Sequence, residues 1–463
     1  MEPRLTDDLK NSIYDGMFAN AFATLTGGGF LTGFALYLGM NDFMIGLVAA
    51  MPFMVTVFQL PAAYLVQKTG KRKKIAYWAS ALARGLWLPI LIVTLLPIAS
   101  GSMKLLVILV TIFLSYSFIS VSYVSWLSWM AEIVPEEIRG RFFGTRNMLC
   151  GVAGMIAMVA FGKLLDYIDG HPYEGLPVGF GITFLSAVLF GMISLHFLNR
   201  ISEPNHGSEM ARPISVRMLI YLPFKEGNFR HFLTFTFLWS FSVYVASPFF
   251  TLYFLRELRF TYGFVALLGM LAAVADMVGM RVWGRISDRV KNKAVIQVSS
   301  WIAIILPVAW ISARPESVVI PIILQIVGGW FWAGINLCTN NLLLKISQQE
   351  NRASYISAFY IVGGLGSALG PIVAGYVLKS IGPLDLHLLS WHPFPIQVIF
   401  IASTLFRLVS FQLFKFVHEP EALTVGQMVR ILRSVRGLTM ANGFNSLLHP
   451  FIEIKADKWE SKQ

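Results

Sequence analysis

Apolar segments long enough to cross a membrane occupy most of this 463-residue chain. Hydrophobic residues make up 56% of the sequence and charged residues only 13%, whereas soluble domains carry roughly 25% charged residues. A helix needs about 20 apolar residues to cross the hydrocarbon core of a bilayer. The sequence therefore predicts an all-α integral membrane protein. About twelve such windows recur, at residues 13–38, 43–66, 75–98, 104–131, 143–166, 177–199, 229–255, 262–286, 294–313, 317–345, 353–379 and 395–417.

The net charge of +12 is a topology signal and does not indicate a nucleic-acid partner. Of the 37 Lys and Arg residues, six lie at one set of predicted helix ends and two, Arg84 and Arg407, lie within spans, which leaves 29 on the other side. Because Lys and Arg concentrate on the cytoplasmic side of membrane proteins, that side is predicted to be cytoplasmic. With an even number of spans, both termini are expected in the cytoplasm and the protein in the plasma (inner) membrane.

Landmarks of the first half of the chain recur in the second half at offsets of 213 to 216 residues. Such a repeat predicts two pseudo-symmetric six-helix bundles, residues 1–199 and 229–417. A cytoplasmic linker, residues 200–228, is expected between them, and residues 418–463 are expected to form a cytoplasmic amphipathic tail. The repeated pairs are Tyr37 and Tyr253, Arg139 and Arg352, Gly162 and Gly375, and Glu203 and Glu419.

Two predicted loops carry related versions of one pattern. Residues 284–293 read Gly-Arg-Ile-Ser-Asp-Arg-Val-Lys-Asn-Lys, and residues 63–72 read Ala-Tyr-Leu-Val-Gln-Lys-Thr-Gly-Lys-Arg. Both resemble the G-x-x-x-D-R-x-G-R-R signature of the major facilitator superfamily, with Gly70 and Lys291 at the second glycine position. Residues 135–141 resemble its second signature, P-x-x-x-R-G-R. The resemblance implies twelve transmembrane helices, a substrate site between the two halves at mid-membrane, and transport by alternating access. A monomer is expected.

The resemblance also assigns gating to the loop residues. An acid placed against the positive N-terminal end of a helix in the opposite half forms an electrostatic latch of ~0.3–2 kcal/mol. Asp288 is the candidate acid, and the resemblance places it near Arg141 and Gly144. Capping and solvation of the loop by Asp288 and Arg289 is the competing interpretation. The predicted gating residues are Gly70, Arg139, Arg141, Gly284, Asp288 and Arg289.

By the same resemblance, the first, fourth, seventh and tenth helices surround the substrate. Polar residues with helical spacing are predicted to face this cavity because polar groups are costly in hydrocarbon, although Ser, Thr and Asn also hold helices together. Hydroxyl, amide and indole groups suit a neutral polyhydroxylated or an amphipathic aromatic molecule. The predicted substrate-binding residues are Asn20, Thr24, Tyr116, Tyr123, Trp126, Thr236, Ser240, Tyr244, Gln325, Trp332, Asn336 and Asn340.

One carboxylate, Asp276, lies near the middle of a predicted span, close to the bilayer midplane. It precedes Asp288 by 12 residues, which places it about 18 Å deeper along the helix. A charged carboxylate is costly there, so Asp276 is the candidate for proton coupling, with a counter-ion role for a cationic substrate and a static structural bond as alternatives. Arg84 and Arg407 are expected to pair or snorkel within one half. If either reached the cavity, an anionic substrate would become plausible.

Patterns of enzymes and metal sites are absent from the sequence, which has no His/Asp/Cys cluster, phosphate-binding loop or nucleophile elbow. Cys150 and Cys338 lie in predicted helices, so a disulfide is not expected. The sequence predicts a proton-coupled secondary transporter of a small solute with no cofactor. The alternatives are a lipid, amphiphile or drug exporter of the same fold and a non-transporting receptor or scaffold.

Overall fold

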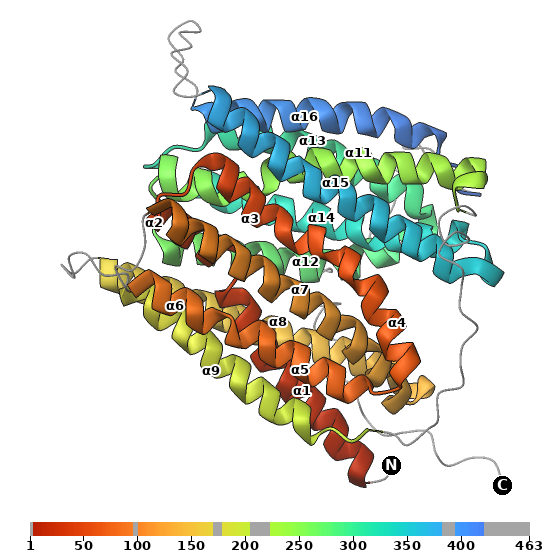
Figure 1. The fold of residues 1–463 in the computed structure, drawn as a ribbon. Helices are drawn as coiled ribbons and strands as arrows, with labels where there is room; N and C mark the ends of the chain where they lie inside the picture. Colours follow the sequence, from red (N-terminus) through yellow and green to blue (C-terminus); the bar gives the residue numbers. More distant parts are fainter. Residues whose placement is uncertain (1–2, 96–100, 170–177, 204–222, 382–393, 421–463) are drawn as a thin grey trace, which may run out of the picture.

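The computed structural model describes residues 3–95, 101–169, 178–203, 223–381 and 394–420 as helices joined by short turns (Figure 1). Eleven helical segments in these ranges are long and apolar enough to cross a membrane. No β-strand occurs in the described part of the chain. The predicted all-α multi-pass membrane fold is confirmed. Most of the predicted linker and tail lies outside the described residues.

The first half of the chain forms one bundle. The helix α1 lies at its centre and packs against α8 and α9. The first predicted span, residues 13–38, is divided between α1 and α2, and α1 is not among the eleven apolar segments because it carries several charged residues. The elements of this bundle are α1 (Pro3–Leu25), α2 (Gly28–Tyr37), α3 (Asp42–Met54), η1 (Val55–Phe58), α4 (Gln59–Thr69), α5 (Arg72–Gly85), α6 (Trp87–Leu95), α7 (Gly101–Ile133), α8 (Glu136–Asp169) and α9 (Val178–Arg200).

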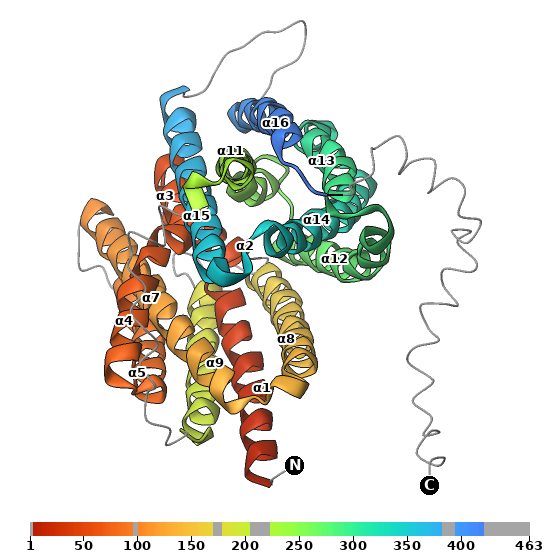
Figure 2. The ribbon, with the colours of Figure 1, turned by 90° about the vertical axis from the view of Figure 1, so that its right-hand side faces the viewer.

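The second half forms a matching bundle, which Figure 2 shows beside the first. Its helices α11, α15 and α16 pack together on one side, and α12, α13 and α14 on the other. The elements of this bundle are α11 (Gly227–Leu252), η2 (Tyr253–Glu257), α12 (Tyr262–Val290), α13 (Asn292–Ala309), η3 (Trp310–Ser312), α14 (Val319–Ile346), η4 (Gln349–Asn351), α15 (Arg352–Ile381), α16 (Pro395–Leu413) and η5 (Phe414–Phe416).

The two bundles meet at one end of the molecule and diverge toward the other (Figure 1). Near the meeting end α3 packs on α15 so closely that a Cβ added to Gly46 would lie 2.3 Å from the Pro371 oxygen. At the other end α4, which continues α3, packs on α7 of its own bundle. A Cβ added to Gly144, near the start of α8, would meet no atom within 4 Å. We call the meeting end the closed face and the end where α1 begins the open face.

Each of the two signature loops turns at the open face through a residue with positive φ. Gly70 ends α4 with φ 66°, and Lys291 ends α12 with φ 71°. The shared positive φ agrees with their assignment to the same signature position. Glycine adopts positive φ readily, but Lys291 combines it with ψ 166°, a region that is almost exclusive to glycine. Lys291 therefore holds a strained backbone.

We expect Lys291→Gly to be more stable than Lys291→Ala by about 1–3 kcal/mol, because only the glycine relieves this strain. Both variants lose the lysine side chain, so their difference isolates the backbone term. Thermal unfolding of the detergent-purified variants measures it. Equal midpoints for the two variants would show that the turn is not strained.

A glutamate at the end of each bundle binds the N-terminus of a neighbouring helix. Glu203 accepts a hydrogen bond from Lys73 N at 3.1 Å, and Glu419 accepts one from Lys293 N at 2.6 Å. Since helix N-termini carry partial positive charge, both carboxylates are well placed. The repeated Glu-Pro landmark therefore marks the same helix contact in both bundles.

The two glutamates differ in burial. Glu203 is exposed, whereas Glu419 is 2% exposed and also accepts from Asn292 Nδ2 at 2.9 Å and Lys345 Nζ at 3.1 Å. Burial by itself raises the pKa of Glu419, but the hydrogen bonds from Lys293, Asn292 and Lys345 outweigh it and lower the pKa below its ordinary value. Because the folded pKa is the lower one, Glu419 contributes stability above the unfolded pKa of about 4.3 and loses it as the pH falls through the folded pKa.

We expect Glu419→Gln to lower the free energy of unfolding by about 1.5–3 kcal/mol at neutral pH, because it removes hydrogen bonds to a buried charged group. Glu203→Gln, the matched exposed change, should cost less. Thermal unfolding between pH 7 and pH 4 measures both effects, and the acid-induced loss of stability should be smaller in Glu419→Gln than in the wild type. Similar costs at the two positions would contradict this account.

Candidate functional site

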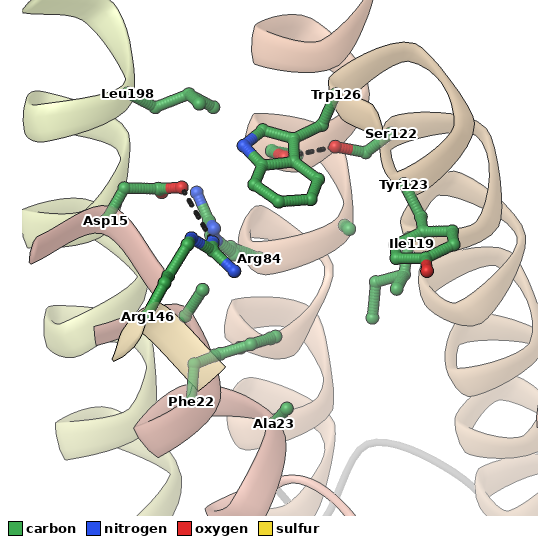
Figure 3. A pocket seen from close by; sticks show the side chains of 13 residues that line it. Asp15, Phe22, Ala23, Arg84, Ile119, Ser122, Tyr123, Trp126, Arg146 and Leu198 are labelled. Carbon is green, nitrogen blue, oxygen red and sulfur yellow. Dashed lines mark hydrogen bonds and ion pairs between the residues drawn. The ribbon is translucent and has the colours of Figure 1, made fainter. Parts of the chain in front are cut away.

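A pocket of about 200 Å³ with a mainly apolar wall and several charged and polar side chains lies inside the N-terminal bundle between α1, α5, α7, α8 and α9 (Figure 3). Apolar side chains such as Phe22, Ile119 and Leu198 form part of its wall. Figure 3 shows acidic and basic side chains meeting on one side of the pocket. Its polar lining consists of Asp15, Ser80, Arg84, Ser122, Tyr123, Trp126 and Arg146.

A buried carboxylate and two arginines form the charged part of this lining. Asp15 on α1 is 4% exposed, accepts a hydrogen bond from Ser194 Oγ at 2.5 Å, and lies 3.8 Å from Arg146 Nη2. Arg84 on α5 is 6% exposed and donates from Nη2 to the same Ser194 oxygen at 2.9 Å. The Ser194 hydroxyl thus links Arg84 to Asp15. The three charged groups sum to one positive charge.

Arg146 is held in place from two sides. Its Nε donates to the Ser12 carbonyl oxygen at 3.1 Å, and its guanidinium lies 4.2 Å from the centre of the Trp126 ring. Such cation–π contacts contribute roughly 0.5–2 kcal/mol. The contact fixes the indole of Trp126 against one wall of the pocket.

Two buried donors of the pocket have no hydrogen-bond partner in the described part of the chain. They are Nη1 of Arg84 and Nε1 of Trp126. Buried donors are nearly always paired in proteins, so unpaired donors at a pocket point to a group that accepts hydrogen bonds. The site can hold an acceptor, and its net charge favours an anionic one.

Sequence reasoning found only part of this pocket. Tyr123 and Trp126 were predicted to bind substrate, and both line it. Arg84 was expected to pair or snorkel within its own bundle, and there it is linked to Asp15 through Ser194 and lines the pocket. Asp15 and Arg146 were missed because each lies only a few residues inside a predicted span, where charges are usually taken for interfacial ones. An acid within a span is nevertheless a functional candidate by default, and that signal was present for Asp15.

Other predicted residues of the N-terminal bundle hold helices together. Asn20 donates from Nδ2 to the Cys150 oxygen of α8 at 2.7 Å, and Thr24 Oγ1 donates to the Asn20 oxygen at 2.8 Å. A Cβ added to Gly154 would lie 2.5 Å from Asn20 Nδ2. The polar stripe on α1 therefore faces α8. Tyr116 on α7 lies close to the α1–α2 turn, with its hydroxyl 3.7 Å from where a Cβ of Gly27 would lie.

The predicted residues of α11 face α15. A Cβ added to Gly363 would lie 3.3 Å from Thr236 Cγ2 and 3.6 Å from Ser240 Oγ. Tyr244 packs edge-on against Phe53 of the N-terminal bundle, with ring centres 4.5 Å apart. These residues lie at helix contacts, and Tyr244 contributes to the contact between the bundles.

The predicted residues of α14 do not line the pocket of the N-terminal bundle. Asn336 and Asn340 are exposed, and Gln325 is half-buried. Trp332 lies beside Arg407, whose guanidinium is 5.9 Å from the indole ring and donates to the Ala303 carbonyl oxygen. The pocket of the N-terminal bundle therefore contains predicted residues of the first half only, and a substrate contact for the residues of α14 stays a prediction.

Asp276 lies in the middle of α12 and is half-buried. The preceding turn contacts α14 at Ala272, whose oxygen would lie 2.2 Å from a Cβ added to Gly329. One turn further back, Gly269 lies against Met158 of α8. Asp276 follows both contacts along α12 and forms no hydrogen bond or ion pair with the residues that the structure describes.

The predicted gating residues lie at the open face. Asp288, Arg289 and Arg141 are exposed, and Asp288 forms no hydrogen bond or ion pair within the described ranges. The predicted latch is therefore not formed in this conformation. Arg139 instead donates to the Ala131 oxygen at 2.9 Å and to Val134 at 3.3 Å, which caps the end of α7. Gly284 lies on α12 opposite α14, where an added Cβ would be 3.5 Å from Leu337.

Charged contacts between the bundles occur at the closed face. Arg256 Nη1 lies 2.6 Å from Asp42 Oδ1 of the other bundle. Asp166, near the end of α8, accepts a hydrogen bond at 2.8 Å from Gly263 N in the first turn of α12. This is an acid against the N-terminus of a helix in the opposite bundle, the same physical device as the predicted latch but formed by other residues at the other face.

Comparisons with solved structures agree with this architecture. A point mutant of the nucleoside transporter NupG superposes with a TM-score of 0.70 at 14% identity, covering 90% of this chain and 100% of that one. A bacterial homologue of the human lysosomal transporter Spinster, inward-facing and unoccupied, gives 0.66 at 15% identity, covering 91% and 100%. The inward-open xylose transporter XylE from E. coli gives 0.57 at 13% identity, covering 92% and 98%.

These identities are low enough that the likeness shows the fold alone. No curated protein sequence matches this chain. The family profile described as Major Facilitator Superfamily matches residues 16–320 and 232–452. Together these two ranges cover nearly the whole chain, so the protein belongs to the major facilitator superfamily.

Proposed function

We propose that the protein is a secondary active transporter that moves a small solute across the membrane by alternating access and couples this movement to protons. The observation that carries the proposal is the asymmetric contact between the bundles, which touch at the closed face and separate at the open face. Two bundles that can rock about such a contact provide access to one side at a time. The nucleoside and xylose transporters of the same fold support this by analogy.

The distribution of basic residues supports a cytoplasmic position for the open face. The turns at Lys71 and Lys291 and the start of α8 at Arg139 and Arg141 all lie there. By the positive-inside rule this face belongs in the cytoplasm. The conformation is then inward-facing, as are the Spinster homologue and XylE structures.

Asp276 is our candidate for the proton carrier. Asp15 is also buried in the helices, but it has Arg146 and Ser194 as partners. Asp276 has no such partner among the described residues. A carboxylate without a partner in an apolar bundle is costly when charged, and proton exchange as the site opens to water avoids that cost.

We expect Asp276→Asn to abolish solute accumulation driven by a pH gradient, because the amide cannot exchange a proton. Uptake into proteoliposomes is measured for a panel of sugars, nucleosides and small organic ions, with and without an imposed gradient. Glu316→Gln, which neutralises an exposed acid in the turn before α14, is the matched control and should behave as the wild type.

Accumulation in Asp276→Asn that kept its full dependence on the gradient would remove the coupling role of this residue. A wild-type protein that binds a panel compound but moves none of them would contradict transport and favour the receptor alternative.

The contacts at the closed face should set the balance between the inward-open and outward-open states. We expect Asp166→Asn to shift this balance toward opening of the closed face by ~0.3–2 kcal/mol, the value of an acid at a helix N-terminus. Spin labels at the exposed positions Lys163 and Glu316, one in each bundle, report the shift as a larger population of long distances.

Asp288→Asn is the matched acid-to-amide control, because Asp288 forms no hydrogen bond or ion pair with the described residues in this conformation. It should not lengthen the distances between the labels. If Asp166→Asn left the distance distribution unchanged, the hydrogen bond to Gly263 would be a packing contact without influence on the conformational balance.

A further inference from the structure

We propose that the pocket of the N-terminal bundle binds the carboxylate of a small organic anion, and that this anion is the transported solute. The inference rests on the proposed transport function for its second part only. The sequence had suggested a neutral polyhydroxylated or amphipathic aromatic solute from the polar residues with helical spacing. The pocket favours a negatively charged solute instead.

The charge of the pocket carries the first step. Arg84 and Arg146 face a single acid, Asp15, among the charged residues of the lining. Asp15 lies 12 residues into α1, and Arg84 lies 12 residues into α5, so both are about 18 Å along their helices from the open-face ends. A positive charge in excess at this depth is costly, because burial removes it from water. A monovalent anion restores neutrality.

The unpaired donors carry the second step. Arg84 donates a hydrogen bond from Nη2 to Ser194 Oγ, and its other terminal nitrogen, Nη1, has no partner in the described structure. The indole Nε1 of Trp126 is unpaired as well among the described residues. A carboxylate offers two oxygens, and charge-assisted bonds from guanidinium to carboxylate are among the stronger hydrogen bonds in proteins. A carboxylate therefore supplies the acceptors that these two donors lack.

The size and wall of the pocket limit the rest of the molecule. Its volume of about 200 Å³ is below the ~300–1,000 Å³ of sites for drug-sized ligands. Phe22, Ile119 and Leu198 offer an apolar wall, and Ala23 and Tyr123 lie at an exposed edge. A short apolar or aromatic body attached to the carboxylate fits this lining.

Substitution of Asp15 should change the affinity for an anion in the direction opposite to substitution of Arg84. Its carboxylate competes with a bound anion for the positive potential of the same two arginines. Removal of its charge leaves two guanidiniums without a compensating acid. Asp15→Asn should therefore strengthen anion binding, whereas Arg84→Gln should weaken it. A variant that merely fails to fold cannot bind more tightly.

The experiment is calorimetric titration of the detergent-purified full-length protein at pH 7 with benzoate and lactate. Benzamide and lactamide serve as neutral isosteres. We expect at least one carboxylate to bind and its amide not to bind. Arg84→Gln should weaken carboxylate binding by roughly 10- to 150-fold, as for the loss of hydrogen bonds to a charged group. Asp15→Asn should tighten it.

Arg407→Gln is the control for the loss of a buried arginine. Arg407 is 3% exposed but lies in the other bundle, where it contacts Ala303 and Trp332. Carboxylate affinity should be unchanged in this variant. The proposal would be overturned if neither carboxylate bound or if a carboxylate and its amide bound equally well. It would also be overturned if Asp15→Asn and Arg84→Gln changed the affinity in the same direction.

Uptake measurements separate this proposal from the proposed function. Carboxylate binding without any flux keeps the anion pocket and contradicts transport. Flux of a neutral panel solute that is insensitive to excess benzoate and to Arg84→Gln keeps transport and overturns the anion as its substrate.

Discussion

The cost of placing a charge inside an apolar bundle governs the arrangement of this protein. Charged side chains lie well inside the helices at Asp15, Arg84, Arg146, Asp276 and Arg407. Asp15 forms an ion pair with Arg146 and is linked to Arg84 through the Ser194 hydroxyl. Asp276 and Arg407 form no ion pair within the described ranges. Because each such charge is costly without a partner, the incompletely compensated ones mark where a proton or a solute can take part.

The two arginines of the third and twelfth spans lie on equivalent helix pairs of the internal repeat. Arg84 on α5 contacts Ser194 on α9, and Arg407 on α16 contacts Ala303 on α13. Ser194 and Arg407 are 213 residues apart, and Arg84 and Ala303 are 219 apart. Each bundle therefore has one arginine at this helix pair. The arginine lies on the first helix of the pair (α5) in the N-terminal bundle and on the second (α16) in the other bundle. Among the described residues, an acid lies beside this arginine only in the N-terminal bundle. That bundle therefore holds a pocket with charged side chains, whereas the arginine of the other bundle donates to a backbone carbonyl.

The sequence predicted the fold because lipid imposes a minimum length on each apolar segment, and the repeated Glu203 and Glu419 mark equivalent helix contacts. Candidate residues were predicted less well, because spacing places Asn20 and Thr24 on one stripe of a helix but does not say which neighbour that stripe faces. Here it faces α8 through Gly154. The side on which the bundles meet depends on small differences in contact energy between two conformations, and no local pattern encodes that.

The helix α12 connects the two faces and explains why only one latch is formed. Gly263, at its first turn, binds Asp166, and Asp288 lies 25 residues later near its other end, about 38 Å away along the helix. If the bundles rock about their contact, bringing Asp288 to α8 at the open face draws Gly263 away from Asp166 at the closed face. The two acid-to-helix contacts are then alternatives, and the free-energy difference between them contributes directly to the balance between the two open states.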